Sequence, residues 1–129
     1  MVQIRILMAF GIVAFVAACA SPKVSKTGPG VRETSVGQVL VDSSGRTLYT
    51  YDQDPKGKSV CTGACAVAWP PAEADGSATP SEGFSVIVRP NGAKQWAHEG
   101  APLYAYLGDN QPGNVSGNGL EGVWHVARP

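Results

Sequence analysis

The residues with the most versatile chemistry are two closely spaced cysteines, Cys61 and Cys65, in the segment Cys-Thr-Gly-Ala-Cys. A thiol pair can form a disulfide, exchange with other thiols or bind a metal ion. The spacing is wider than that of a thioredoxin-type dithiol, and no histidine follows Cys65, as covalent haem attachment would need. In an exported chain we expect the pair to form a disulfide, with redox or metal handling as the alternative.

All four tyrosines lie in two segments of the form Tyr-x-Tyr-x-x-Asp. These segments comprise Tyr49, Tyr51 and Asp54, and Tyr104, Tyr106 and Asp109. Residues two apart on a strand face the same side, so Leu48 and Leu103 are expected to face the opposite side from the tyrosines. We expect the rings to pack at the core edge with hydrogen-bonded hydroxyls. An aromatic ligand-binding face or an electron-hopping pair is the alternative.

Each aspartate of these segments follows the expected end of a strand. A carboxylate in that position commonly accepts backbone N–H groups in a turn. We therefore expect Asp54 and Asp109 to stabilise turns rather than to bind a metal ion.

The two tyrosine segments belong to a longer internal repeat with a constant offset of 55 residues. The same offset relates Leu48 to Leu103 and Trp69 to Trp124, and it also relates a glycine before each segment. Such agreement at one offset indicates duplication of a structural unit. The first copy is expected at about residues 39–71 and the second at about 94–127.

Alternation of apolar and polar residues predicts mainly β-structure around this repeat. We expect a hairpin over 39–51 with its turn at Ser44-Gly45, a strand over 84–89, a hairpin over 95–107 and a last strand over 123–127. Residues 64–69 favour a short helical turn, and 72–83 favour a polar loop. The sequence therefore predicts one small, mainly β domain of two related β-hairpin repeats, spanning residues 36–129.

Few other residues favour catalysis or cofactor binding. The only histidines are His98 and His125, and they are expected to be solvated or hydrogen-bonded strand residues. The segment 117–122 matches a dinucleotide-binding pattern but leads into a strand, where that pattern needs a helix. We find no catalytic motif, so we expect a protein that is not an enzyme and has no metal site, cofactor or nucleotide.

The charge balance argues against nucleic acid as a partner. Ten basic and ten acidic side chains cancel, and no run of lysines or arginines is present.

The N-terminus has the layout of a secretory signal. Arg5 precedes an apolar run from Ile6 to Ala18, which is too short for a stable membrane span. Residues 1–18 are therefore expected to be a signal peptide. The polar stretch that follows, up to residue 35, is expected to be a flexible tether.

The segment Val16-Ala17-Ala18-Cys19 resembles the lipobox of bacterial lipoproteins. The resemblance implies that Cys19 is acylated and becomes the first residue after cleavage, so that membrane lipid holds the chain in the cell envelope. Several acyl chains anchor a protein stably where one does not. The residue after Cys19 is Ala20 and not aspartate. In this it resembles Gram-negative lipoproteins that are sorted to the outer membrane.

The paired Tyr-x-Tyr-x-x-Asp segments and their distal tryptophans resemble the secreted lipoprotein repeat family with a Tyr-x-(Phe/Trp/Tyr)-x-x-Asp motif. The resemblance covers about residues 39–127 and implies a location and an architecture, because the family has no established activity. Our hypothesis is a non-enzymatic binding or structural module with an envelope protein as its possible partner. The alternative is a periplasmic accessory for redox or metal handling through Cys61 and Cys65.

The lipid-anchor assignment predicts that Cys19→Ala abolishes acylation and signal processing, because the acyl acceptor is the thiol itself. Metabolic labelling with radioactive palmitate should mark the wild-type chain and leave the variant unlabelled. Label in the variant would place the acyl chain elsewhere.

Overall fold

The structure is a computed structural model that describes Gly11 and residues 26–129. The expected acylation site, Cys19, lies outside these residues, as do the expected signal peptide, apart from Gly11, and residues 20–25 of the tether. In the described part of the chain, no helix is long and apolar enough to cross a membrane.

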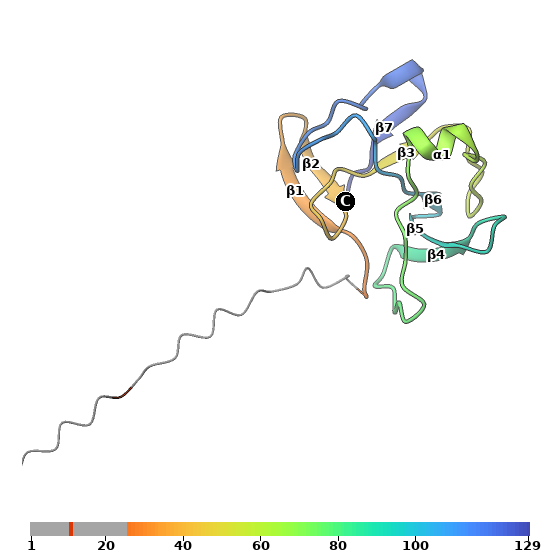
Figure 1. Ribbon diagram of the computed structural model, residues 1–129, viewed down its shortest axis with the longest axis horizontal. Coiled ribbons are helices and arrows are strands. Elements are labelled where there is room, and N and C mark those ends of the chain that lie inside the picture. Colours follow the sequence, from red (N-terminus) through yellow and green to blue (C-terminus); the bar gives the residue numbers. More distant parts are fainter. Residues whose placement is uncertain (1–10, 12–25) are drawn as a thin grey trace, which may run out of the picture.

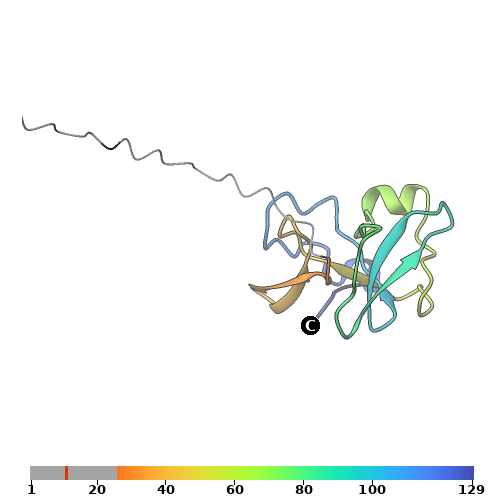
Figure 2. The same ribbon diagram turned by 90° about the horizontal axis from the view of Figure 1, so that it is seen from below.

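Three small antiparallel sheets form the fold (Figure 1). One pairs β1 (Gly30–Thr34) with β2 (Gly37–Val41), and a second pairs β3 (Tyr49–Tyr51) with β7 (Trp124–Val126). The third contains β4 (Phe84–Val88), β5 (Lys94–His98) and β6 (Ala101–Pro102). Two views show the β3–β7 pair between the other two sheets (Figures 1 and 2). The mainly β fold class predicted from the sequence is confirmed.

The short helical segments lie in the connections between strands. Helix α1 (Ala64–Ala68) agrees with the helical turn expected over 64–69, and it follows Gly63, whose φ of 58° favours glycine. A single 3-10 turn, η1 (Leu120–Gly122), precedes β7.

Strand β1 corrects the expected tether, because residues 30–34 belong to the folded domain. They pair along their whole length with β2, from Gly30 opposite Val41 to Thr34 opposite Gly37. The Thr34 hydroxyl donates to the carbonyl of Gly37 at 2.7 Å, and Gly37 has a φ of 93° that closes the turn. The sequence did not predict this strand because its composition is polar, and four of its five residues are exposed.

The hairpin expected over 39–51 forms its turn but not its full ladder. The amide of Gly45 donates to the Asp42 carbonyl at 2.9 Å, as the Ser44-Gly45 turn predicts. Beyond the turn, Leu48 donates to Leu40 at 2.9 Å, and the chain then leaves this partner. β3 pairs with β7 instead, so the strand continues into a contact with the end of the chain.

The second expected hairpin is also shorter than predicted. Ala101–Pro102 pairs with β5, and the amide of Leu103 adds one hydrogen bond to the Trp96 carbonyl at 2.9 Å. The rest of the expected strand, over 104–107, crosses to the first repeat. Ala105 donates to the Pro70 carbonyl at 2.8 Å, and Leu107 donates to Ala68 at 2.9 Å. The strands expected at 84–89 and 123–127 are confirmed as β4 and β7.

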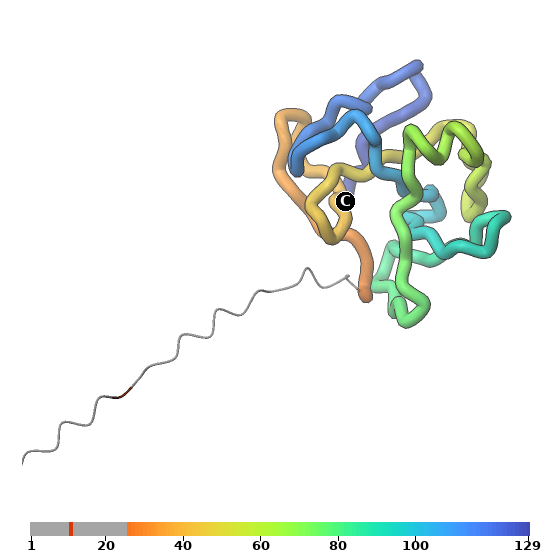
Figure 3. The backbone as a smooth tube through the Cα atoms, viewed as in Figure 1, coloured from red at the N-terminus to blue at the C-terminus, as the bar shows by residue number. Residues whose placement is uncertain are grey.

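The two repeats are therefore interleaved rather than stacked as separate units. Figure 3 shows the C-terminal part of the chain returning to lie beside the first strands. Ala127 joins them directly: it accepts from Leu40 and donates to Leu48, both at 2.8 Å. The core has an aromatic cluster and an aliphatic cluster, and the latter contains Leu40, Leu48 and Leu103.

Candidate functional site

The first tyrosines of the two motifs lie directly opposite each other. The amide of Tyr49 donates to the carbonyl of Tyr104 at 2.7 Å, and the amide of Tyr104 donates back at 3.0 Å. Both side chains are fully buried. Because the two residues hold the same position in the two copies, this exchange relates the copies by an approximate twofold axis.

The motif aspartates are exchanged between the copies. Tyr49 Oη donates to Asp109 Oδ2 at 2.5 Å, and Tyr104 Oη donates to Asp54 Oδ2 at 2.6 Å. Each tyrosine therefore finds its carboxylate in the other copy and not in its own motif. The sequence shows that both residue types recur, but it does not reveal this exchange.

The second oxygen of each carboxylate holds a turn, as predicted from the sequence. Asp54 Oδ1 accepts from the amide of Val60 at 2.7 Å, and Asp109 Oδ1 accepts from the amide of Ser116 at 3.0 Å. The hydroxyl of Ser116 also donates to Asp109 Oδ1. The motif carboxylates thus join a loop of their own copy to a tyrosine of the other.

Burial keeps both phenols protonated and able to donate. Loss of hydration, followed by the hydrogen bond to Asp54, raises the pKa of Tyr104 to about 12. Burial and the Asp109 hydrogen bond raise the pKa of Tyr49 still further. Burial also raises the pKa of Asp54, against the lowering effect of its bonds from Tyr104 and Val60.

Four rings form a continuous stack, which we call the aromatic column: Tyr51, Trp124, Trp69 and Tyr106. The two tryptophan rings lie at the centre with centroids 3.8 Å apart and planes 4° apart. Tyr51 stacks on Trp124 and Tyr106 stacks on Trp69, each with a centroid distance of 4.3 Å. Each tyrosine again meets the tryptophan of the other copy.

The first motif tyrosines close the sides of this column. Tyr49 meets Trp69 edge-on and Tyr104 meets Trp124 edge-on, both with centroids 5.3 Å apart. A Cβ on Gly117 would lie 2.7 Å from the Trp69 ring and 3.0 Å from Tyr49, so only glycine lets the loop approach. The expected packing with hydrogen-bonded hydroxyls describes Tyr49 and Tyr104, and these rings offer no open ligand-binding face.

Cys61 and Cys65 form a disulfide across the start of α1. Cys61 is buried in the aromatic cluster, and Cys65 packs partly buried against it. Within the described residues, no group of three or more His, Cys, Asp or Glu side chains could hold a metal ion. The histidines are separate: His125 Nε2 lies 2.8 Å from exposed Asp52, and His98 packs against Phe84.

One charged side chain, an arginine, is buried although the sequence did not predict it. Arg89, only 6% exposed, donates to Ser59 Oγ at 2.7 Å, to Gln95 Oε1 at 2.8 Å and to the Cys61 carbonyl at 2.7 Å. Ser59 Oγ lies 2.6 Å from Tyr104 Oη, whose proton already goes to Asp54, so Ser59 is the donor. Alternation placed Arg89 at the end of a strand, with no signal that its charge is buried.

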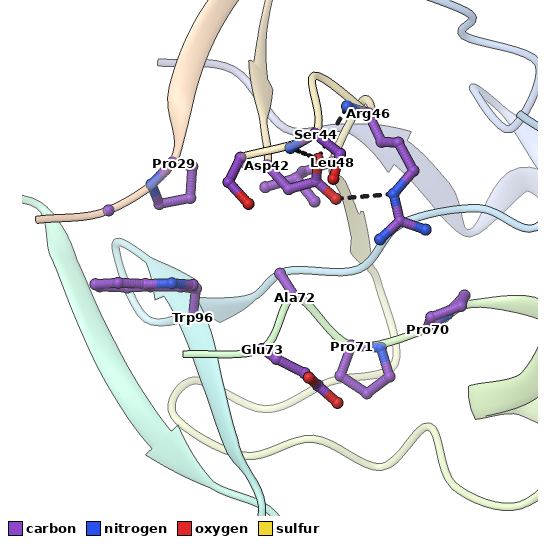
Figure 4. Close-up of a pocket in the computed structure, with 12 residues that line it drawn as sticks. Pro29, Asp42, Ser44, Arg46, Leu48, Pro70, Pro71, Ala72, Glu73 and Trp96 are labelled. Carbon is purple, nitrogen blue, oxygen red and sulfur yellow. Dashed lines mark hydrogen bonds and ion pairs between the residues drawn. The ribbon is translucent and has the colours of Figure 1, made fainter. Parts of the chain in front are cut away.

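A groove of about 390 Å³ lies between the β2–β3 turn and the segment that follows α1. Figure 4 shows Pro29, Asp42 and Ser44 on one side and Trp96, Ala72 and Pro71 on the other. We call this the junction groove; its lining also includes Gly28, Ser43, Arg46, Leu48, Pro70 and Glu73.

The charged edge of the junction groove is an ordered pair. Asp42 accepts from the amides of Ser44 and Arg46 and from Arg46 Nε at 2.9 to 3.0 Å. In the described part of the chain, no side chain or carbonyl accepts from the terminal nitrogens of Arg46 at hydrogen-bond distance. That guanidinium is therefore able to bind an external acceptor.

The junction groove is not duplicated, in contrast to the aromatic column. At the offset of 55, Asp42 corresponds to Ala97, Arg46 to Ala101 and Pro71 to Val126. Trp96 corresponds to Val41. The shared residues of the repeat build the centre, and two of them, Leu48 and Ala72, also reach the groove, whereas its charged and proline residues occur in one copy alone.

Comparison with known proteins finds the same two repeats. A family model described as a secreted repeat of unknown function matches residues 30–73 and 85–128. The two matches differ by the same 55 residues, and the first begins at β1, inside the stretch that the sequence had assigned to the tether. No curated protein and no solved structure matches the chain.

The exchange of carboxylates predicts energetic coupling between the copies and not within them. In a double-mutant cycle, Tyr49→Phe and Asp109→Asn should couple by about 0.5 to 3 kcal/mol, because they share one buried hydrogen bond. The matched cycle of Tyr49→Phe with Asp54→Asn, which joins residues of one motif, should show coupling near zero. Urea unfolding of the variants measures both, and the reverse pattern would contradict the exchange.

Proposed function

We propose that this chain, which belongs to the family of secreted repeats of unknown function, is a lipid-anchored, non-enzymatic module that binds another envelope component through the junction groove. The lipid anchor is assigned to Cys19 on its lipobox resemblance. The outer membrane is the assigned membrane for a Gram-negative host.

The observation that carries the proposal is the asymmetry of the groove. Duplicated residues are accounted for by the core, since they satisfy one another across the pseudo-twofold axis. The charged and proline residues of the groove, such as Asp42, Arg46 and Pro71, have no counterpart of the same type in the other copy, and the groove has a volume of about 390 Å³. That volume falls within the usual size range of ligand sites.

The chemistry of the groove favours a ligand with an apolar part and a hydrogen-bond acceptor. Pro29 and Pro71, both partly exposed, offer apolar surface without donors. Arg46, whose side chain is 47% exposed, offers planar donors at one end. An extended segment of an envelope protein, with apolar side chains and a carboxylate, has both features.

The non-enzymatic part of the proposal rests on how the candidate reactive groups are engaged. The motif carboxylates accept from phenols and backbone amides, and the phenols are buried. General acid or base catalysis needs such groups within reach of a substrate.

Redox handling by Cys61 and Cys65 is less favoured as a function. Thiol–disulfide exchange needs access of a thiolate to one of the two sulfurs. Cys61 is 1% exposed, so attack would have to occur at Cys65. The carbonyl of Cys61 is also held by Arg89, which adds to the structural role of this bridge.

The groove proposal is tested by a photo-crosslinking amino acid at exposed Ser43 in the lipidated protein, irradiated in native envelopes. A discrete adduct should form, and Arg46→Glu should reduce it by about tenfold, the effect of about 1.4 kcal/mol. Lys58→Glu makes the same charge change outside the groove and should leave the adduct intact. Melting temperatures should differ little, because the Arg46 ion pair is exposed.

An adduct that survives Arg46→Glu unchanged would remove the groove from the interaction. Absence of any adduct at Ser43, with a crosslink from a probe at Lys58, would place the binding surface elsewhere.

A further inference from the structure

We propose that the stacked tryptophans of the aromatic column take up one-electron oxidising equivalents and pass them to Tyr49 and Tyr104, whose phenolic protons move to the carboxylates they contact. This relay is a second activity, and it does not depend on the junction groove. Its ligand class is a one-electron oxidant, such as a small inorganic radical.

The electron path is a series of direct ring contacts. The column runs from Tyr51 through Trp124 and Trp69 to Tyr106, with centroid distances of 4.3, 3.8 and 4.3 Å. Its two ends are only partly buried, whereas the tryptophans are 6% and 2% exposed. An oxidant can therefore meet the column at its ends, while the charge moves to rings shielded from water.

The side branches lead to the buried tyrosines. Tyr49 contacts Trp69 and Tyr104 contacts Trp124, each with a centroid distance of 5.3 Å. An electron that leaves Tyr49 thus reaches the tryptophan pair in a single step between touching rings. The pseudo-twofold axis supplies the same step a second time through Tyr104.

The proton has a defined acceptor at each buried tyrosine. Oxidation makes a phenol strongly acidic, so the step needs a base within hydrogen-bond reach. Asp109 Oδ2 lies 2.5 Å from Tyr49 Oη, and Asp54 Oδ2 lies 2.6 Å from Tyr104 Oη. No hydrogen bond in the described part of the chain joins the hydroxyl of Tyr51 or Tyr106 to a carboxylate.

The step balances without a bound cofactor. The oxidant gains one electron from the tryptophan pair, and Tyr49 returns one electron to that pair. The O–H bond of Tyr49 breaks, and its proton forms a new O–H bond at Asp109. The products are the reduced oxidant, a neutral tyrosyl radical and a neutral carboxylic acid, and a one-electron donor reverses the sequence.

Packing alone does not require this chemistry at the centre of the domain. A buried polar pair adds little net stability over apolar groups of the same shape, although loss of one partner is costly. Phenylalanine opposite an apolar residue would fill the same space. The structure instead places a phenol–carboxylate pair beside each tryptophan of a stacked pair.

Pulse radiolysis of the purified full-length chain with azidyl radicals tests the relay. The tryptophan radical absorption should decay at a rate independent of protein concentration, with a matching rise of tyrosyl radical. Asp54→Asn with Asp109→Asn keeps hydrogen-bond acceptors but removes the bases, and should slow this transfer at least about a hundredfold. Near-ultraviolet circular dichroism checks that the tryptophan pair stays stacked.

The matched control is Trp96→Phe, which removes the tryptophan outside the column and should leave the transfer rate unchanged. Tyr51→Phe with Tyr106→Phe keeps a ring at each end of the column but removes the two phenols without carboxylate partners, so any tyrosyl radical that forms in this variant belongs to Tyr49 or Tyr104. Absence of a tyrosyl radical in the Tyr51/Tyr106 variant, or an unchanged rate in the asparagine variant, would overturn the proposal.

A measurement on the wild-type chain remains decisive if the asparagine variant fails to fold. Freeze-quench electron paramagnetic resonance should show a tyrosyl radical with the g-tensor of a strongly hydrogen-bonded oxygen. A radical confined to the tryptophans, or a tyrosyl radical without that hydrogen bond, would contradict the assignment.

Discussion

Each repeat donates a hydrogen bond from a buried phenol to a carboxylate of the other repeat, and this exchange joins the two copies into one core. Tyr49 needs Asp109 and Tyr104 needs Asp54, because a buried hydroxyl or carboxylate without a partner costs about 1 to 3 kcal/mol. Neither repeat satisfies its own motif. Each copy is therefore half of a core, and the second copy supplies the other half.

The remaining features of the centre follow from this exchange. Mutual pairing of Tyr49 with Tyr104 brings the tryptophans of the two copies face to face, and it leads β3 to the last strand. Residues that repeat at the offset of 55 serve that closure. The buried Arg89 and most residues of the junction groove differ in type between the two copies. Closure of the repeat therefore does not fix the residue types at these positions.

The sequence predicts the duplication, the mainly β content, the helical turn and the strands β4 and β7, because these depend on local pattern and composition. It does not predict the strand partners, since a hairpin signal at Ser44-Gly45 fixes a turn and not how far the strands run together. The sequence does not predict β1, because exposed and mainly polar residues form this strand. The sequence does not predict the burial of Arg89, because these hydrogen-bond partners of its side chain are distant in sequence.

Each repeat folds only against the other, and separated halves of the domain show whether this is so. Residues 26–75 and 76–129, divided in the exposed loop at Gly76, each carry one complete Tyr-x-Tyr-x-x-Asp motif. Near-ultraviolet circular dichroism of the stacked tryptophans reports the native centre. We expect no such signal from either fragment alone and its recovery when the two fragments are mixed. A native signal from one fragment alone would show that a single repeat folds without the other.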